Sequence, residues 1–240
     1  VHRGEEDAAR LRVALVVDRR PMRRALHHPL GLHPAAPLDG LDADRLVLLG
    51  DVFHHWWGFP DTVMEPYAPC CAALLRARER GVRIQAVRGN HDFALGPFFT
   101  EQLSAEILDT TPLVLDGVRF VFAHGDEADT SLGYRLTRLT LRSWPFAAFL
   151  RLLGPDRAYA LLRRLAGDRD HRGAPSELQL ARQRSWAETH VNRGADVVVL
   201  GHLHAPGSWT IGSGQLFRLG DWSQGPVWLE IENGQPRLMR

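Results

Sequence analysis

Short apolar runs that end in a polar turn alternate with helical patterns in the first half of the chain. Residues 11–17 (LRVALVV) and 45–50 (RLVLLG) have the composition of buried strands, because both are rich in Val and Leu. A helical pattern near 61–80 ends at Gly81, and a further strand is expected at 82–88. Strands and helices that alternate in this way predict an α/β fold.

The second half begins with a hairpin and returns to strands after a helical insertion. Residues 113–126 (LVLDGVRFVFAHGD) have the pattern of a β-hairpin with Asp116-Gly117 at its turn. From about 129 to 194 the pattern is helical and contains no strand. Asn233-Gly234 marks another hairpin turn, and the late strands are expected at 197–201, 208–211, 215–219 and 227–232. We therefore predict one domain over 1–240 with helices inserted at about 129–194.

Composition and charge restrict the class of protein. At 240 residues with 45% hydrophobic content the chain can bury a sizeable core, and no apolar run approaches the roughly 18 residues of a membrane span. The net charge of +1 gives no reason to expect nucleic acid as a partner. Cys70 and Cys71 lie on an apolar helical pattern, so we expect core thiols, which suit a reducing cytoplasm. The charged N-terminal stretch speaks against a signal peptide, and a cytoplasmic protein is expected.

Residue types that bind metal ions follow the predicted strands, at the point where each strand ends. Taken singly, an Asp there is most often a turn or helix cap and a His is a surface or core residue. Together they favour one metal site, because functional groups converge at the carboxyl ends of strands in α/β sheets. Mixed Asp, Asn and His ligands suit divalent ions such as Mn²⁺. The residues are Asp18, Asp51, Asn90, His91, His124, His202 and His204.

Four segments of the chain together resemble a known family. They are GDVFHHW (50–56), RGNHDFALG (88–96), FAHGD (122–126) and GHLHAP (201–206). In this order they are similar to the successive motifs of the calcineurin-like metallophosphoesterases. Trp56, GNHDFALG and the Gly133-Tyr134 pair after HGD further resemble the UDP-2,3-diacylglucosamine diphosphatases of lipid A synthesis. The likeness covers about residues 11 to 225 and implies a four-layer α/β/β/α sandwich with an inserted helical lid.

The resemblance implies two divalent metal ions, for which we expect Mn²⁺, and a set of ligands for them. Asp51 would bridge both ions, and Asp18 and His204 would complete the first site. The other three ligands would form the second site. The implied set is Asp18, Asp51, Asn90, His124, His202 and His204. Two ions about 3.5–4 Å apart can hold the attacking and leaving oxygens of a phosphoryl transfer.

The implied reaction is hydrolysis of a phosphoanhydride, with UDP-2,3-diacylglucosamine giving UMP and 2,3-diacylglucosamine 1-phosphate. His91 would donate a proton to the leaving group or stabilise charge in the transition state. Asp92 either orients His91 or caps the turn. Two other functions stay open: a metallophosphoesterase for another nucleotide or lipid phosphate, and a scaffold whose catalysis is impaired.

The helical insertion supplies candidate groups for binding a nucleotide-linked lipid. The three arginines among them are spaced at three and four residues, hence on one helical face, and could meet a diphosphate. Residues 139–154 and 158–167 combine large apolar side chains with Arg. Such segments either cover acyl chains and contact an anionic membrane surface, as a peripheral protein of the inner membrane would, or pack on the core. The candidates are Asp129, Tyr134, Arg135, Arg138 and Arg142.

The first motif departs from the pattern of the family. The family has Asp-x-His, whereas this chain has VVDRRP, with Asp18 in register and Arg20 where a ligand is expected. A guanidinium has no lone pair to give to a cation. Arg20 therefore points away, contacts substrate phosphate or leaves the first site underoccupied, unless 19–39 holds a sequence error. We expect a weakened first site with Asp18, Asp51 and His204, beside an intact second site. Replacement ligands could come from His27, His28, His33 or His54.

Overall fold

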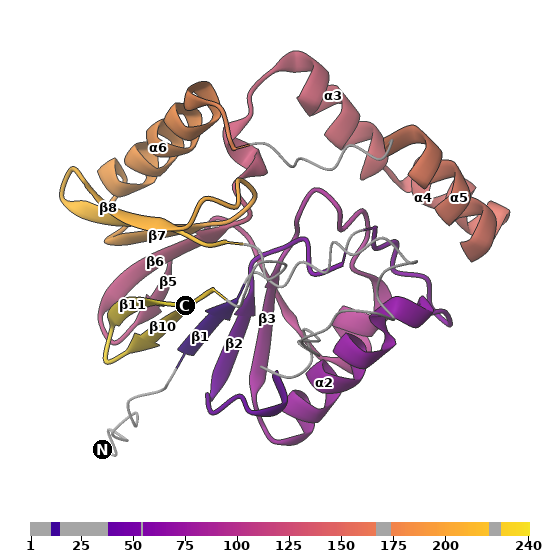
Figure 1. The fold of residues 1–240 in the computed structure, drawn as a ribbon, viewed down its shortest axis with the longest axis horizontal. Helices are drawn as coiled ribbons and strands as arrows, with labels where there is room; N and C mark the ends of the chain where they lie inside the picture. The colour runs from indigo at the N-terminus through magenta and orange to yellow at the C-terminus, as the bar shows by residue number, and fades with distance from the viewer. Residues whose placement is uncertain (1–10, 15–37, 54, 167–173, 221–226) are drawn as a thin grey trace, which may run out of the picture.

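Two β-sheets packed face to face form the centre of the molecule (Figure 1). The computed structural model describes residues 11–14, 38–53, 55–166, 174–220 and 227–240. Strands and helices alternate along the described parts of the chain, and the predicted α/β class is confirmed.

The first sheet has six strands in the order β11-β10-β1-β2-β3-β4. Strands β1 to β4 are parallel, whereas β10 pairs antiparallel with β1 and β11 pairs antiparallel with β10. The carboxyl ends of β2 and β3 therefore lie at one edge of the sheet. The strands are β1 (Leu11–Ala14), β2 (Arg45–Leu48), β3 (Arg83–Val87), β4 (Glu106–Leu108), β10 (Trp228–Glu232) and β11 (Gln235–Met239).

The second sheet has five strands in the order β5-β6-β7-β9-β8. Strands β6, β7 and β9 are parallel, and the hairpin partners β5 and β8 run antiparallel to β6 and β9. Since Ala123 pairs with Leu200, the residues that follow β6 and β7 emerge side by side. The strands are β5 (Leu113–Leu115), β6 (Val118–Ala123), β7 (Val197–Leu200), β8 (Gly207–Ile211) and β9 (Gly214–Arg218).

Helices connect the strands and fill the long insertion between β6 and β7. Helix α6 begins at a capping box, in which Ser176 and Gln179 satisfy each other's backbone N–H groups. The longer helices are α2 (Ala68–Glu79), α3 (Leu132–Leu141), α4 (Trp144–Leu153), α5 (Pro155–Ala166) and α6 (Glu177–Asn192). The short ones are η2 (Glu65–Tyr67), the π-helical turn η3 (Phe98–Gln102) and η4 (Asp126–Ala128).

Three apolar clusters show how the layers stack. One cluster joins α2 to the outer face of the first sheet and contains both cysteines, which are buried in the core as predicted. A second lies between the sheets and includes Val47 and Phe122. The third joins α6 to the outer face of the second sheet through residues such as Ala187 and Val198. The order of layers is therefore α2, first sheet, second sheet and α6, with apolar burial as the main stabilising contribution.

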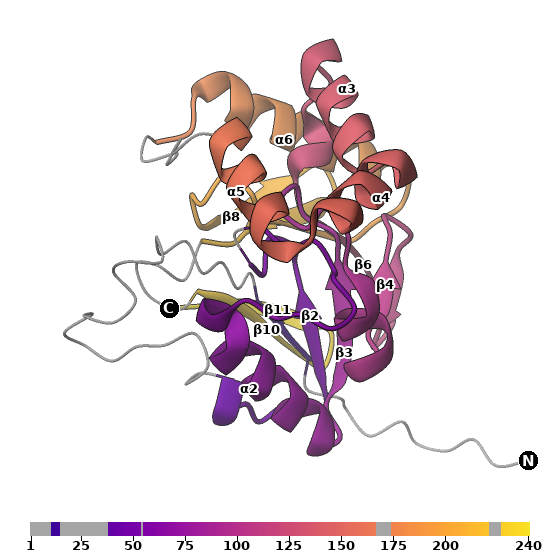
Figure 2. The same cartoon turned by 90° about the vertical axis from the view of Figure 1, so that its right-hand side faces the viewer.

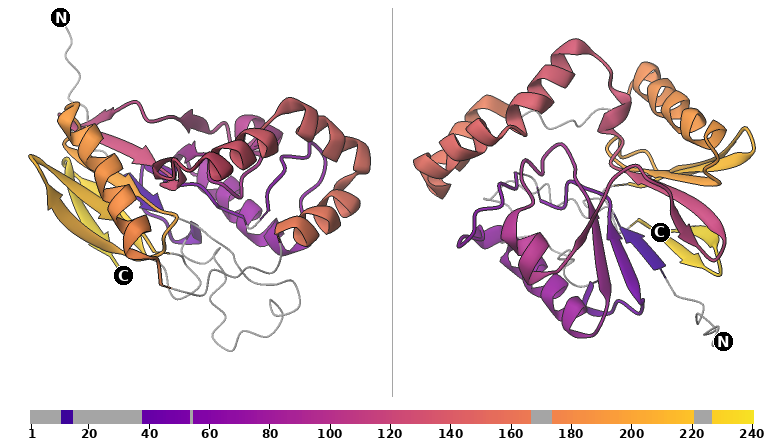
Figure 3. Two further views of the ribbon diagram at one scale, coloured as in Figure 1. Left: turned by 90° about the horizontal axis from the view of Figure 1, so that it is seen from above. Right: turned by 180° about the vertical axis from the view of Figure 1, so that it is seen from behind.

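Helices α3, α4 and α5 follow one another across the top of the molecule in the view of Figure 1, and Figure 2 shows α4 and α5 above the loops that follow β2 and β3. Seen from above in Figure 3, they are separate from α6, which packs on the second sheet. Trp57, Phe93, Leu150 and Ala158 form a small cluster that fastens α4 and α5 to those loops. Among the described residues, no helix is long and apolar enough to cross a membrane.

Turn chemistry at the two predicted hairpins is confirmed. Asp116 and Gly117 have φ of 48° and 79°, and Asn233 and Gly234 have φ of 51° and 71°, so both central residues are left-handed in each turn. Strand β4 and the η3 turn were not predicted from the sequence, and β11 was implied only by the Asn233-Gly234 turn, without bounds. Residues 15–17 of the first expected strand lie outside the described residues.

Candidate metal centre

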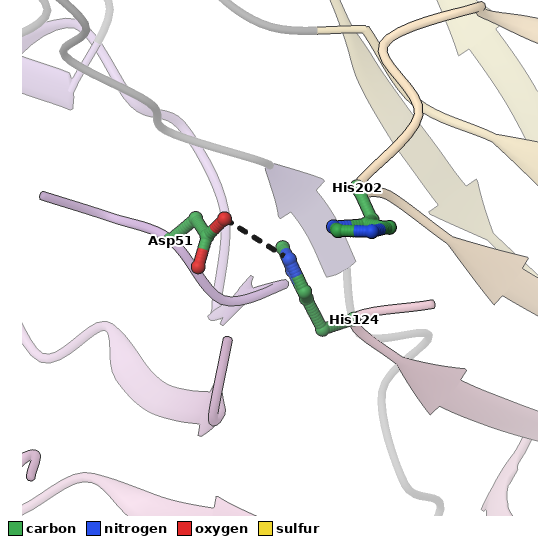
Figure 4. Close-up of side chains that lie close together, drawn as sticks. All are labelled: Asp51, His124 and His202. Carbon is green, nitrogen blue, oxygen red and sulfur yellow. Dashed lines mark ion pairs between the residues drawn. The ribbon is translucent and has the colours of Figure 1, made fainter. Parts of the chain in front are cut away.

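Asp51, His124 and His202 come together where the two sheets meet, and their ligand atoms lie within 4.8 Å of one another (Figure 4). Asp51 follows β2 in the first sheet, whereas the two histidines follow β6 and β7 in the second. Asp51 Oδ2 lies 3.1 Å from His124 Nε2, and the His124 and His202 rings are 5.1 Å apart. A carboxylate and two imidazoles grouped in this way can hold a divalent cation.

The backbone at these positions is unusual. Asp51 has φ of 51° and His202 has φ of 67°, a left-handed conformation that is uncommon for residues other than glycine. Glycines let the loops meet closely: a Cβ on Gly89 would overlap the Asp51 carboxylate. A Cβ on Gly50 would lie 2.7 Å from the Gly89 backbone and from His124 Nδ1. The glycines beside the ligands are therefore required by close approach as well as by turn geometry.

His124 is held in the orientation of a metal ligand. Its ring is fully buried, and Nδ1 lies 2.9 Å from the Leu49 carbonyl oxygen, to which it donates its proton. This hydrogen bond directs Nε2 toward Asp51 and toward Asn90 Oδ1, at 3.0 Å. A backbone carbonyl that receives the second ring N–H of a ligating histidine is the usual support of such a ligand. Asn90, His124 and Asp51 are thus brought together, as the resemblance implied.

The charges of the centre fit a cation. Burial alone would raise the pKa of Asp51, but the positive charges of His124 and His91 outweigh it and lower that pKa. Burial lowers the pKa of His124, yet the Asp51 charge raises it to about 10, which favours a protonated imidazole beside the carboxylate. Burial and the charge of His124 lower the pKa of His202 to about 3, which leaves its imidazole neutral. A divalent ion can take the place of the proton on His124 Nε2, and these residues fit the implied metal.

Asp92 is used to shape the loop around Asp51. Its buried Oδ2 accepts hydrogen bonds from Asp51 N at 2.6 Å and from Gly89 N at 3.1 Å. Burial and the Asp51 charge raise the pKa of Asp92 to about 7. These contacts correspond to the capping alternative of the sequence analysis. His91 N in turn donates to Asp51 Oδ1 at 2.7 Å, so the backbone of His91 orients the predicted bridging carboxylate.

Three of the predicted substrate-binding residues meet at a carboxylate that sequence reasoning missed. Asp126 is fully buried, and its Oδ2 accepts a hydrogen bond from the Tyr134 hydroxyl at 2.9 Å and from Arg138 at 3.3 Å. Arg142 lies 3.7 Å from the same oxygen and donates to the Gly89 carbonyl at 2.7 Å. The HGD motif, in which an acid follows a ligand histidine, was the available signal for Asp126. Helix α3 is thereby joined to two loops of the metal centre.

The remaining predicted residues lie elsewhere. Asp129 forms an ion pair with Arg182 of α6 at 3.0 Å, and Arg135 is exposed on α3. His204 has φ of 53° in the turn that holds His202, but it is not among the three residues whose ligand atoms lie within 4.8 Å. Residues outside the described part of the chain include Asp18, Arg20, His27, His28, His33 and His54.

A cavity of about 310 Å³ opens beside the centre, between the loop after β2 and the start of α5. Its wall includes Trp56, Trp57 and Phe59 from the loop and Pro155 from α5. His55 lines it as well, and the His55 ring lies 5.5 Å from the His91 ring. A cavity with a partly aromatic wall therefore begins at the histidine that neighbours the predicted proton donor.

The fold and the site together define an α/β protein whose sheets present a buried carboxylate–histidine centre for a divalent metal. The calcineurin-like phosphoesterase family matches residues 27–206, and the chain belongs to this family of metal-dependent phosphohydrolases. The resemblance found in the sequence is therefore confirmed.

The chain is also similar to curated proteins and to solved structures. The chain is 34% identical to a UDP-2,3-diacylglucosamine hydrolase of Aeromonas salmonicida (strain A449) over 83% of this chain and 82% of that protein. It is 29% identical to the protein of the same name from Marinobacter nauticus, over 83% of this chain and 85% of that one. A solved archaeal phosphodiesterase is similar with a TM-score of 0.49 and 11% identity, over 96% of this chain and 98% of that chain.

Proposed function

We propose that the protein hydrolyses the phosphoanhydride of UDP-2,3-diacylglucosamine to UMP and 2,3-diacylglucosamine 1-phosphate, with two divalent metal ions. The observation that carries the proposal is the convergence of Asp51, His124 and His202 on one buried point, in a chain of this family. The name of the relatives, UDP-2,3-diacylglucosamine hydrolase, supports the choice of substrate.

Asn90, His124 and His202 would hold one ion, Asp51 would be shared, and Asp18 and His204 would serve the other. Divalent ions bound there would supply the positive charge that polarises the phosphoanhydride. The chain itself fixes its ligands before any ion arrives: the backbone N–H of His91 orients Asp51 Oδ1. Such preorganisation avoids reorganisation during the reaction.

His91 is the residue that we propose as the proton donor to the leaving group. Its backbone N–H donates to Asp51 Oδ1, and its ring lies 5.5 Å from the ring of His55, which lines the cavity. An imidazole is a suitable donor because its ordinary pKa lies near neutral pH. Tyr134, Arg138 and Arg142 would bind the diphosphate from the opposite side, where they already surround one carboxylate oxygen of Asp126. A phosphate oxygen offers them the same type of acceptor.

The cavity beside the centre suits an acyl chain. Aromatic side chains form much of its wall, and its volume of about 310 Å³ lies at the lower end of ligand pockets. An apolar chain that enters it would leave water without the loss of polar hydrogen bonds.

Helices α3 and α4 present a surface that we propose lies against an anionic membrane. Leu132, Leu136 and Leu139 are exposed to 83%, 67% and 68%, whereas the polar residues Tyr134 and Arg138 face the protein. A helix that packs on a core turns its apolar face inward, whereas α3 turns its apolar face to solvent. Trp144 and Leu152 on α4 are also exposed, by 80% and 88%. Arginine is the main charged residue of the surrounding helices, and anionic lipid is the matching partner.

Release of UMP from UDP-2,3-diacylglucosamine tests the proposed reaction. Metal-stripped protein should release UMP only after Mn²⁺ is added, and Asp51→Asn should lower kcat by about 100-fold or more, because a neutral amide with one oxygen cannot bridge two ions as a carboxylate does. Asp39→Asn is the matched control: Asp39 is an exposed carboxylate paired with Arg76, and we expect turnover within twofold of wild type.

The alternatives give different results. Hydrolysis of a generic phosphodiester without UMP release would support a phosphoesterase activity and would reject UDP-2,3-diacylglucosamine as the substrate. Binding of Mn²⁺ without hydrolysis of either compound would favour the impaired scaffold. The sequence supports that alternative because it has Arg20 where the family has a ligand histidine.

A further inference from the structure

Gln183 of α6 lies at the back of the metal centre and takes part in none of the chemistry described above. The side chain is 2% exposed, although glutamine is mostly found at protein surfaces. Its Nε2 lies 3.1 Å from the Gly201 carbonyl oxygen and 3.4 Å from the Gly125 carbonyl oxygen. Each of these glycines is the immediate neighbour of a candidate ligand, His202 and His124 respectively.

The orientation of this amide is determined by its surroundings. Both partners are backbone carbonyls, which only accept, so the NH₂ group must face them and can donate one proton to each. Among the described residues, the buried Oε1 of Gln183 has no hydrogen-bond partner. A buried acceptor without a partner is costly, and its retention suggests that the NH₂ group has a compensating role.

The loops that Gln183 joins need such support. Gly125 has φ of 106°, a backbone conformation that favours glycine, and a Cβ there would lie 2.5 Å from Gln183 Nε2. The next loop contains His202 at φ of 67°. One further bond joins the two loops directly, from Gly201 N to the His124 carbonyl at 2.9 Å. The amide therefore closes a small network that sets the spacing of the two histidines.

We infer that Gln183 is a positioning residue that holds the His124 and His202 loops at the separation a divalent ion requires. The inference rests on the proposed metal centre and adds to it a residue that touches neither metal nor substrate. Small errors in the placement of ligands weaken metal sites strongly, and partners behind the ligands commonly change metal affinity by 10–100-fold.

Gln183→Met tests this role, because methionine keeps the length and volume of the side chain and removes both donors. The matched control is Gln85→Met. Gln85 is also buried, at 1% exposure, but its Nε2 donates to Glu106 Oε2 at 2.7 Å on β4, away from the histidine loops. Free Mn²⁺ is measured by electron paramagnetic resonance in a titration of metal-stripped protein, and urea unfolding of the metal-free proteins gives their stabilities.

We expect Gln183→Met to raise the Mn²⁺ dissociation constant about tenfold. Gln85→Met should leave it within twofold of wild type, although both variants lose stability. Gln183→Glu, which places a negative acceptor against two carbonyl oxygens, should weaken binding further.

The inference is overturned if Gln183→Met and wild type bind Mn²⁺ equally, or if both methionine variants weaken binding to the same extent. These results leave the proposed function intact, since wild type still binds the ion. If wild type itself binds no Mn²⁺, the proposed metal centre fails, and the role of Gln183 fails with it.

Discussion

Gly89 shows how closely single residues are constrained at the metal centre. The space that a side chain would occupy there is filled by the Asp51 carboxylate, which the His91 and Asp92 contacts hold in place. Gly89→Ala should displace Asp51, lower Mn²⁺ affinity and turnover at least tenfold, and cost about 1–3 kcal/mol of unfolding free energy, as overpacking does. Mn²⁺ titration, the UMP assay and urea unfolding measure these three effects.

Gly133→Ala is the control for this substitution. Gly133 lies in α3, and a Cβ there meets no atom within 4 Å. We expect unchanged affinity and a small gain in stability, because alanine is the better helix former. Normal Mn²⁺ affinity in Gly89→Ala would show that Asp51 does not need its observed position.

At the scale of single residues, the candidate ligands were predictable from the sequence. The hydrogen-bond partners that hold the ligand loops in place were not. Asp51, His124 and His202 each follow an apolar run, so a local pattern identified them. One partner of Asp92 is the backbone of Asp51, 41 residues earlier, and the two partners of Gln183 are carbonyls 18 and 58 residues away. Contacts of that kind depend on tertiary packing, which no local pattern encodes.

Helix α3 is the element that connects the insertion to the metal centre. Arg142, the C-cap residue of α3, donates to the Gly89 carbonyl and lies beside the buried Asp126 carboxylate. Arg142→Ala should therefore lower the unfolding free energy by about 1.5–3 kcal/mol, the range for hydrogen bonds of charged groups, and speed amide hydrogen exchange in α3. Urea unfolding and hydrogen exchange followed by mass spectrometry measure the two effects.

Arg135→Ala provides the comparison on the same helix, because Arg135 is exposed. Surface substitutions of this kind usually change stability by less than about 0.5 kcal/mol. Equal exchange rates in the two variants would mean that packing alone holds α3 in place.

Some elements could not be predicted from patterns for identifiable reasons. β4 has three residues at the edge of the first sheet, too few for an alternating pattern to be visible. β11 contains Pro236, which normally argues against a strand, but β11 is an edge strand, where proline is tolerated. The long helical insertion was recognised as helical, whereas the packing of α6 on the second sheet became evident only from buried positions such as Ala187 and Val191.

At the scale of the whole molecule, the metal centre is a product of the packing between two sheets. One sheet supplies Asp51 and the other supplies both histidines, and the apolar layer between the sheets fixes their separation. The order of the family motifs predicted that ligands from both sheets converge. The strand patterns alone do not show which face of one sheet packs against the other. The first of the two predicted metal sites includes Asp18, which lies outside the described residues, and this site stays a prediction.

We propose that the outward face of α3 and α4 brings the whole molecule to a membrane surface. Its exposed leucines lie on the side of α3 opposite the residues that hold Asp126, so they can enter a lipid surface without disturbing the metal centre. Protein mixed with sedimenting vesicles of phosphatidylcholine and phosphatidylglycerol should therefore pellet with them, and added salt should weaken binding because arginine attracts anionic lipid.

The double variant Leu136→Ser with Leu139→Ser should weaken that binding at least tenfold. Burial of one leucine side chain gains about 1.5–3 kcal/mol, and a tenfold change in affinity corresponds to about 1.4 kcal/mol. Leu178→Ser, on exposed Leu178 of α6, is the matched control and should bind as wild type does. UMP release from a short-chain soluble substrate should stay unchanged in the double variant. If Leu178→Ser weakens binding equally, or if the double variant binds normally, the α3–α4 face is not the membrane contact. A dimer of wild type that the double variant abolishes would instead assign this face to a second copy of the chain.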